Sequence, residues 1–327
     1  MISDGYIVRY PILFMVFNRP RQTKQVFDVI KSVKPNKLYI QQDAPRKGNL
    51  TDIDKCKEVK EIITDIDWDC EVKYSFPKSN LGCALAGKTA WDWIFEYENE
   101  MIFIEDDGLV SLSFFQFCDE LLNQYRNDMR IAYIGGVNYG VKQGSASYFF
   151  SRTGSGTYAM ATWKRVHELY EFDLGSLTDK RLQKDIKKNY VSSFVRIYMY
   201  NLYNKFKLYG GNTYDLQMVY LVNRYNMLNI VPNVNMCTNI GFGEDASNTS
   251  SLNIPMNYLN RERFELREVI HPKHIGMDSS FERKYFRYRV FLGDVKFNKL
   301  LQYYYSVTRQ RVKTLVKNLV RDYARRK

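Results

Sequence analysis

The chain has 327 residues, of which 45% are hydrophobic and 26% are charged, a balance typical of a soluble globular protein. No stretch approaches the roughly 20 apolar residues that a transmembrane helix needs, and the N-terminus lacks a signal-peptide pattern. The five cysteines are scattered and include no Cys-x-x-Cys pair, which disfavours a zinc site or a disulfide framework and favours a reducing cytosol.

The net charge of +12 is concentrated at the C-terminal end of the chain. Residues 283–327 hold 14 Lys or Arg and two acids, so the preceding 282 residues hold 34 basic and 34 acidic side chains. A neutral body with a basic tail indicates binding either to nucleic acid or to an anionic membrane surface.

Predicted strands and helices alternate through the first 140 residues. An apolar run at residues 12–17 predicts a buried strand, and the helical spacing of Val26, Ile30 and Val33 predicts a helix after it. Similar signals predict strands at residues 37–42, 70–76, 101–104 and 131–135, and helices at residues 53–66, 82–97 and 111–125. This alternation predicts an α/β fold with a largely parallel sheet covered by helices on both faces.

The second half of the chain has a less regular pattern. Residues 142–156 are rich in Gly, Ser and aromatic residues, which predicts a loop or hairpin. Residues 182–209 are aromatic and basic and predict a helical insertion, either mobile or facing an acceptor. A helix that opens on Asp215, a short strand at 228–234 and a glycine-punctuated loop at 239–246 follow.

The C-terminal tail has the pattern of an amphipathic helix. Val312, Leu315 and Leu319 fall at three- and four-residue steps, with Lys and Arg on the other face, as in helices that lie in a membrane interface. A basic helix packed on its own domain is nearly as good an explanation. We therefore predict a globular domain, residues 1–280, followed by a basic helical tail, residues 281–327.

The most informative segment is residues 101–107, in which four apolar residues run into three acids. Such a run predicts a fully buried strand. Three adjacent carboxylates at its end repel one another and lose hydration, unless a cation neutralises them. Because Mg²⁺ and Mn²⁺ take carboxylate and phosphate oxygens, the segment predicts a metal–diphosphate site at the carboxyl edge of the sheet. A strand that ends in a solvated acidic turn is the alternative.

Residues 82–89 match the phosphate-loop pattern G-x-x-x-x-G-K-[ST]. That loop must follow a strand directly and open a helix at its lysine. Here residues 84–86 already have helical character, which places Lys88 inside a helix, and residues 77–80 separate the motif from the preceding strand. A phosphate-loop NTPase or a nucleotidyltransferase that uses this segment is therefore only an alternative.

Several segments together resemble nucleotide-sugar glycosyltransferases of the GT-A fold. They are residues 17–20 after the first strand, 42–46 after the second, 105–117, 214–217 and 239–246. Residues 105–117 are the most specific, since their E-D-D-x-x-x-S-x-x-F-F-x-F pattern is also found in the eukaryotic N-acetylglucosaminyltransferase that starts complex N-glycan assembly. The other segments resemble blocks of bacterial surface-polysaccharide transferases. The resemblance implies a Rossmann-like, mostly parallel sheet with helices on both faces.

The resemblance also implies a role for each matching residue. Asp107 would bind a divalent cation, Mn²⁺ or Mg²⁺, that bridges the diphosphate of the donor. Asp215 would be the general base of an inverting transfer, although an acid at a helix start is also a common cap. The residues implied to bind the nucleotide sugar are Arg19, Asp43, Arg46, Glu105 and Asp106, with Asp43 on the base, which is uracil in this interpretation.

Three further features carry weaker predictions. His271 is a candidate additional metal ligand, with a structural role as the alternative. Gly241 and Gly243 are placed to bring backbone N–H groups close to phosphate, or only to shape a turn. Residues 158–163 read Tyr-Ala-Met-Ala-Thr-Trp where bacterial relatives often have W-G-W-A-T-W, so the sugars involved do not follow from the resemblance.

The sequence thus predicts a metal-dependent, hexosyl-transferring glycosyltransferase that uses a nucleotide-diphosphate sugar, with a UDP-sugar favoured. Its acceptor would be a hydroxyl of a surface-glycan or lipid-linked molecule, as in lipopolysaccharide or capsule synthesis. The basic tail would bind anionic lipid, which gives a cytoplasmic enzyme peripheral to the inner face of the membrane. Nucleic-acid binding through the tail is a weaker alternative, so no nucleic-acid partner is expected.

Overall fold

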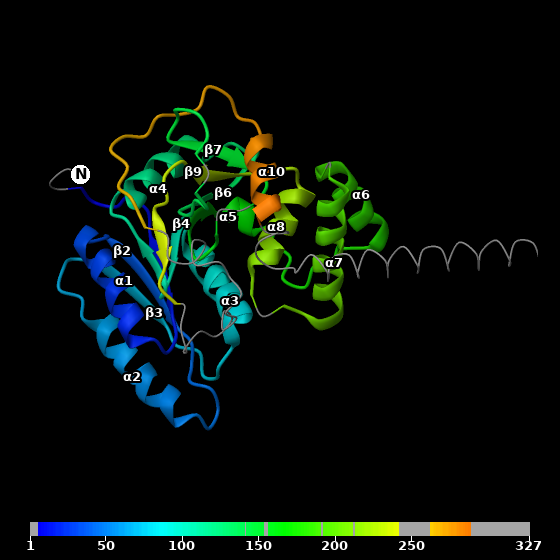
Figure 1. Ribbon diagram of the computed structural model, residues 1–327. Coiled ribbons are helices and arrows are strands. Elements are labelled where there is room, and N and C mark those ends of the chain that lie inside the picture. The colour runs from blue at the N-terminus through cyan, green and yellow to red at the C-terminus, as the bar shows by residue number, and fades with distance from the viewer. Residues whose placement is uncertain are drawn as a thin grey trace, which may run out of the picture.

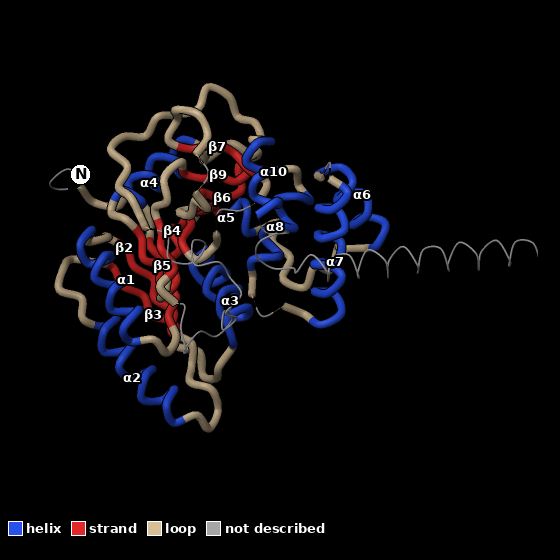
Figure 2. Tube along the Cα trace, viewed as in Figure 1, coloured by secondary structure: helices blue, strands red, loops and turns tan. Residues whose placement is uncertain are grey.

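The protein is built on one large sheet with helices packed around it (Figures 1 and 2). The computed structural model describes residues 6–140, 142–153, 156–190, 192–211, 213–241 and 262–288. The strands are β1 (Ile12–Val16), β2 (Lys37–Gln42), β3 (Glu71–Ser75), β4 (Glu100–Glu105), β5 (Gly108–Val110), β6 (Ile131–Gly135), β7 (Tyr148–Ser151), β8 (Ala159–Trp163), β9 (Leu228–Pro232) and β10 (Cys237–Asn239). The helices are α1 (Pro20–Val33), α2 (Leu50–Thr64), α3 (Gly82–Tyr97), α4 (Ser113–Gln124), α5 (Lys164–His167), α6 (Asp179–Asn189), α7 (Ser193–Tyr209), α8 (Asp215–Arg224) and α10 (Ser279–Tyr288).

The large sheet has the strand order β3-β2-β1-β4-β8-β6-β9-β7. All its strands run in one direction except β8 and β7, which pair antiparallel with their neighbours. The predicted α/β fold with a mostly parallel sheet is therefore confirmed. The antiparallel position of β8 between β4 and β6 was not predicted, because its small residues give no strong strand signal.

The chain reverses its direction across the sheet between β1 and β4. From β1 it moves outward to β2 and β3, and then returns past both to place β4 on the other side of β1. Because crossovers between parallel strands are right-handed, α1 and α2 cover one face of the sheet and α3 covers the other (Figure 1). The gap between the carboxyl ends of β1 and β4 is thus the switch point at which open α/β sheets bind ligands.

The burial of the strands follows their sequence patterns. Every residue of β1 and β6 is buried, whereas β3 at the sheet edge is partly exposed. Helix α4 contributes three fully buried phenylalanines to the core, Phe114, Phe115 and Phe117. All three aromatic positions of the E-D-D-x-x-x-S-x-x-F-F-x-F pattern therefore lie in the core.

A second hydrophobic cluster joins helices α6, α7, α8 and α10 to strands β7 and β9. Phe281, Tyr285 and Phe286 of α10 are buried in it, and the carboxylate of Glu282 accepts bonds from Ser151 Oγ at 2.7 Å and from Thr153 Oγ1 at 2.8 Å. The predicted boundary at residue 281 therefore falls inside a helix that belongs to the folded body. The rest of the predicted tail, from residue 289, lies outside the described residues.

No helix in the described part of the chain combines the length and the apolar character needed to cross a bilayer.

Candidate active site

The three acids lie where β4 ends, at the switch point of the sheet. Glu105 is the last residue of β4, Asp106 and Asp107 form the turn after it, and Gly108 opens β5. A Cβ atom at Gly108 would lie 2.6 Å from the carbonyl oxygen of Tyr158, so only glycine allows the turn to press this closely against β8. The turn is thus rigidly placed by the backbone around it.

Arg19, at the start of α1 beyond β1, is the cation that faces these acids. Its Nη1 atom lies 2.8 Å from Asp107 Oδ2 and 3.2 Å from Asp106 Oδ1. The backbone N–H of Phe17 donates to Asp106 Oδ2 at 3.2 Å. Because all three charged side chains are largely buried, the pairing is stronger than a surface ion pair would be.

In the described part of the chain one arginine faces three carboxylates, of which Asp106 and Asp107 are buried and Glu105 is partly exposed. Burial raises the pKa of Asp106 to about 7, although the charge of Arg19 lowers it and that of Asp107 raises it further. Burial also raises the pKa of Glu105 well above its usual range, and the charges of Asp107 and Asp215 add to this effect. Additional positive charge at this edge would therefore be stabilising.

Asp107 is the acid best placed to hold a cation. Its side chain is 12% exposed, and its Oδ1 atom is buried without a hydrogen bond of normal geometry, although a hydrogen bond from the Asn239 side chain lowers the pKa of the carboxyl. Ile240, just after β10, donates its N–H to the Asp107 carbonyl at 2.9 Å. A Cβ atom at Gly241 would lie 2.2 Å from Asp107 Oδ2, so only glycine lets this backbone approach the carboxylate.

The donor set fits a cation held mainly by its substrate. Among the described residues, no three His, Cys, Asp or Glu side chains form a cluster that could enclose a metal ion by themselves. Mg²⁺ and Mn²⁺ are nevertheless commonly bound through one or two carboxylates, with water and substrate phosphates as the other ligands. The free Oδ1 atom of Asp107 meets that requirement.

Helix α8 brings a fourth acid and a tyrosine to the same edge. Asp215 is its first residue, and the hydroxyl of Thr157 donates a hydrogen bond to the Asp215 carboxylate. Tyr214, immediately before, is buried and donates its hydroxyl to Glu105 Oε1. One helix start therefore connects the predicted general base to the acidic turn.

The phosphate-loop match has a structural explanation that involves the same tyrosine. Residues 82–97 form α3, so Lys88 lies inside the helix as predicted, and it forms an ion pair with Asp92. Gly82 has a positive φ of 74° at the start of the helix. A Cβ atom at Gly87 would lie 2.6 Å from the Tyr214 ring, so this glycine makes room for Tyr214 and no phosphate loop is present at the motif.

Asp43 lies at the end of β2 and ties that strand to α3. Its carboxylate accepts bonds from the backbone N–H groups of Leu81 and Gly82 at 2.9 and 3.0 Å, and from Asn80 Nδ2 at 3.0 Å. Burial raises its pKa, while these N–H groups lower it. Asp43 therefore stabilises the start of α3, and its contact with a nucleotide base stays a prediction.

Arg46 and His271 do not reach the acidic turn in this structure. Arg46 donates to Asp52 Oδ2 at 2.5 Å from Nε, and its side chain is 57% exposed. The ring of His271 contacts Tyr148 Oη through Nδ1 at 2.8 Å and Glu120 Oε1 through Nε2 at 3.0 Å. This placement does not support a metal-ligand role for His271, while Gly243 lies outside the described residues.

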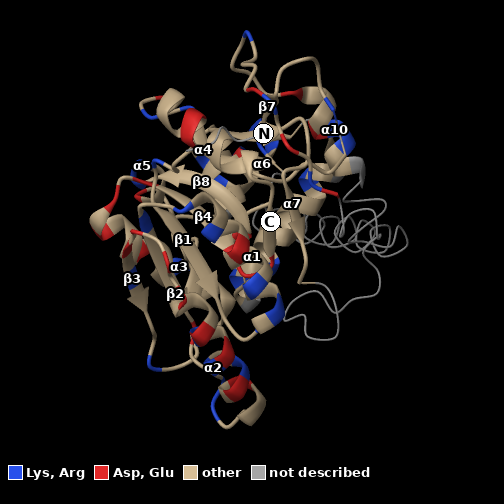
Figure 3. Ribbon diagram, turned by 90° about the vertical axis from the view of Figure 1, so that its left-hand side faces the viewer, with Lys and Arg blue, Asp and Glu red and all other residues tan. Residues whose placement is uncertain are grey.

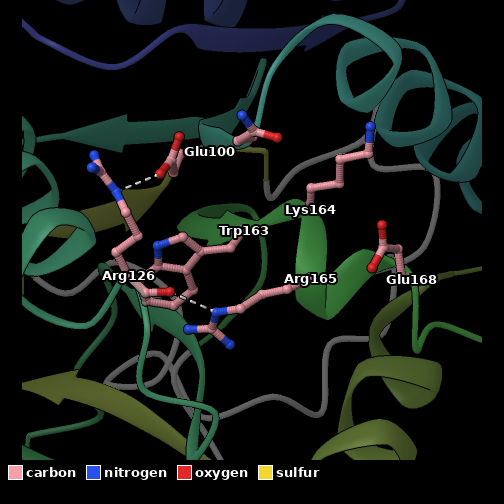
Figure 4. Close-up of a pocket in the computed structure, with 7 residues that line it drawn as sticks. Glu100, Arg126, Trp163, Lys164, Arg165 and Glu168 are labelled. Carbon is pink, nitrogen blue, oxygen red and sulfur yellow. Dashed lines mark hydrogen bonds and ion pairs between the residues drawn. The ribbon is translucent and has the colours of Figure 1, made fainter.

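A pocket of about 500 Å³ opens at the other end of β4, where the strand begins (Figure 4). It is lined by Asn99, Glu100, Arg126, Trp163, Lys164, Arg165 and Glu168. In Figure 4 the guanidinium group of Arg126 points to the carboxylate of Glu100, and their Nε–Oε1 distance is 2.8 Å. None of the predicted site residues lines this pocket, so the pocket and the acidic turn are separate features.

Neither a protein-family model nor a curated protein sequence matches this chain significantly. Solved structures resemble it in part. A 4-diphosphocytidyl-2C-methyl-D-erythritol synthase from Anaerococcus prevotii is 12% identical, with a TM-score of 0.32 over 62% of this chain and 97% of that one. An apo UDP-glucose pyrophosphorylase is 10% identical, with a TM-score of 0.34 over 68% of this chain and 90% of that one. A UDP-glucose pyrophosphorylase bound to UDP-glucose is 13% identical, with a TM-score of 0.25 over 49% and 70% of the two chains. Likeness of this degree assigns no activity to this chain.

Proposed function

We propose that the protein is a glycosyltransferase that moves a sugar from a nucleotide diphosphate, with UDP favoured, to a hydroxyl group of an acceptor. One observation carries the proposal: a buried excess of carboxylates, with one unpartnered oxygen on Asp107, lies at the switch point of the sheet beside Asp215. A diphosphate with its cation fits this charge pattern, and a carboxylate nearby fits the deprotonation of an acceptor.

Asp107 would hold the divalent cation through its free Oδ1 atom. When bound, Mn²⁺ or Mg²⁺ would neutralise the negative charge that develops on the leaving diphosphate. Arg19 already contacts Asp107 Oδ2, so it fixes the orientation of the carboxylate and leaves Oδ1 available. Glu105 and Asp106 would add negative charge around the cation and lie near the nucleoside.

Asp215 would take the proton from the acceptor hydroxyl as that oxygen attacks the anomeric carbon. The hydrogen bond from Thr157 fixes the direction of the Asp215 carboxylate. A single in-line attack with one base and no covalent intermediate inverts the anomeric configuration. We therefore propose an inverting transfer.

The acceptor is proposed to be a surface-glycan precursor linked to lipid, on the cytosolic face of the membrane. The support is the charge of the C-terminal region, since clustered Lys and Arg attract anionic headgroups. Removing residues 289–327 should weaken membrane association, as measured by fractionation of cell extracts. The cut must follow residue 288, because an earlier one would remove the buried aromatic residues of α10. Unchanged fractionation would refute the anchor.

A nucleotidyltransferase would use the same acidic edge, but it would attack the α-phosphorus and not the anomeric carbon. Two assays distinguish the reactions. We expect Mn²⁺-dependent release of UDP from a panel of UDP-sugars, abolished by a chelator. Release of pyrophosphate from UTP and a sugar 1-phosphate, without UDP release from any nucleotide sugar, would overturn the proposal.

A further inference from the structure

The charged residues divide unequally between the sheet-containing body and helices α6, α7 and α10 of the second hydrophobic cluster. We define the helical unit as residues 171–211 and 279–288, which include α6, α7 and α10. It carries 11 basic and 5 acidic residues, and residues 289–327 add 11 basic and 2 acidic ones. The remainder of the chain carries 26 basic and 29 acidic residues. Acids and bases are mixed along α1 and α2 of the body (Figure 3).

The basic residues of α6 gather on one exposed face. Lys180, Lys184 and Lys187 recur at steps of four and three residues, with Lys188 beside them, and all four are exposed. The opposite face packs Leu182 and Ile186 into the second cluster. In the part of the chain that the structure describes, no ion pair joins these four lysines to a carboxylate. Their charge is therefore not matched by any side chain that the structure describes.

An exposed apolar side chain lies on the neighbouring helix. Leu208, near the end of α7, is 74% exposed, and Lys205 one turn earlier is exposed as well. The buried face of α7 is formed by Val195, Met199 and Tyr203, so Leu208 lies on the outer side of the helix. Helices α6 and α7 contact each other and lie together at one flank of the molecule, away from α1 and α2 (Figure 1).

The helical unit is also where the chain enters its most basic segment. Helix α10 packs Phe281 and Tyr285 into the second cluster, and residues 289–327 follow it directly. The helical unit therefore carries the lysine face of α6 and directly precedes the basic residues 289–327 in the sequence. Cationic and aliphatic side chains combined in this way are typical of surfaces that bind anionic lipid headgroups.

We propose that the helical unit is the surface by which the protein docks on an anionic lipid bilayer, through the lysine face of α6 and Leu208 of α7. This docking surface depends on the proposed function, because an enzyme with a lipid-linked acceptor must work at the bilayer. A bilayer fits better than nucleic acid, because an exposed leucine gains from contact with hydrocarbon, whereas single-stranded RNA is read by aromatic and arginine stacking.

The test is sedimentation of the full-length protein with two kinds of vesicle, one of phosphatidylcholine alone and one that also contains phosphatidylserine. The variant Lys184→Gln/Lys187→Gln/Lys188→Gln should bind the anionic vesicles about 100-fold more weakly, at about fivefold per lysine. The variant Leu208→Ser should weaken vesicle binding less than the triple lysine variant does, and by the same factor for both kinds of vesicle.

A matched variant, Lys47→Gln/Lys57→Gln/Lys78→Gln, removes the same charge from exposed positions of the body. It should keep most of the vesicle affinity. Equal losses of vesicle affinity in the two triple variants would overturn the proposal, and so would an α6 variant that binds anionic vesicles as well as the wild type. An α6 variant that loses affinity for poly-uridine RNA but keeps its affinity for vesicles would also overturn it. Release of UDP from a soluble donor should be the same in all these variants, so failure of vesicle binding would leave the proposed reaction standing.

Discussion

The two ends of strand β4 both collect charged side chains, but they differ in how those charges are matched. At the amino end, Arg126 pairs with Glu100, and the guanidinium of Arg165 donates to three backbone carbonyls at 2.9–3.0 Å. At the carboxyl end, Glu105, Asp106 and Asp107 face one arginine. The amino end has the pocket and the carboxyl end has the unbalanced buried charge.

This difference teaches that the presence of a pocket is by itself a poor guide to a ligand site. Three of the charged side chains that line the pocket in Figure 4 already have partners, because Arg126 pairs with Glu100 and Arg165 donates to backbone carbonyls. A buried carboxylate oxygen without a partner is costly for the free protein, and a bound cation would remove that cost. The predictions below test whether the two ends of β4 differ in this way.

The largest effect is expected from Asp107→Asn. This change keeps the shape of the side chain and removes one negative charge. It should lower the rate of metal-dependent UDP release about 10³-fold, because the cation would stabilise the transition state by several kcal/mol. The melting temperature of the metal-free protein should rise, since one buried, poorly matched charge is gone. The change Glu100→Gln at the amino end is the matched control, and it should alter neither quantity appreciably. Similar losses in both variants would contradict the comparison.

The next largest effect is expected from Asp215→Asn. Transfer to the acceptor should fall about 10²-fold, while the affinity for UDP and Mn²⁺ stays unchanged, because the residue acts on the acceptor and not on the donor. Affinity can be measured by calorimetry and transfer by product formation. A variant that loses UDP affinity but keeps its maximal rate would show Asp215 to be part of the donor site.

The change Gly87→Ala sharpens the role of Tyr214. The new methyl group would overlap the Tyr214 ring, displace its hydroxyl from Glu105, and cost about 1–3 kcal/mol of unfolding free energy. Gly175→Ala is a suitable control, because a Cβ atom at Gly175 meets nothing within 4 Å. Chemical denaturation of both variants measures the difference. Equal stability of the two would mean that Tyr214 is not held as the structure has it.

The last expected effect is a dependence of stability on pH. Burial raises the pKa of Asp106 to about 7 in the folded protein, whereas an unfolded chain has an aspartate pKa of about 3.9. The folded state therefore binds more protons between these values, and its stability falls as the pH rises from about 4 to 7. The melting temperature of the metal-free protein should decrease across this range more in the wild type than in Asp106→Asn. If the melting temperatures of the two proteins fell equally with pH, the raised pKa of Asp106 would be contradicted.

The sequence predicts the α/β core well, because each buried strand and amphipathic helix leaves a clear periodic signal. The apolar run before Glu105 predicts β4, and helical character at residues 84–86 correctly places Lys88 inside α3. The roles of Tyr214 and Thr157 were missed, because they depend on α8 packing beside β4, and the Tyr214–Glu105 contact joins residues about a third of the chain apart. Gly82 and Gly87 together resemble a phosphate loop in the sequence, although Gly82 is explained by its positive φ and Gly87 by the room it makes for the Tyr214 ring.

The domain boundary could not be predicted for a related reason. A cationic amphipathic helix has the same pattern whether it packs on a protein or on a membrane, so residues 281–288 were placed in a separate tail. Burial of Glu282 against Ser151 and Thr153 decides the matter for α10, and neither partner has a signal in the sequence of that helix. Similarly, the contacts of Asp43 with α3 depend on the chain folding back from residue 80.

The central claim is that the carboxyl end of β4 holds a divalent cation through Asp107. The most direct test is anomalous diffraction from a crystal grown with Mn²⁺ and UDP. The account predicts a manganese peak beside Asp107 Oδ1, bridged to the diphosphate. A peak at the pocket of Figure 4, or a bound diphosphate with no metal at Asp107, would contradict it.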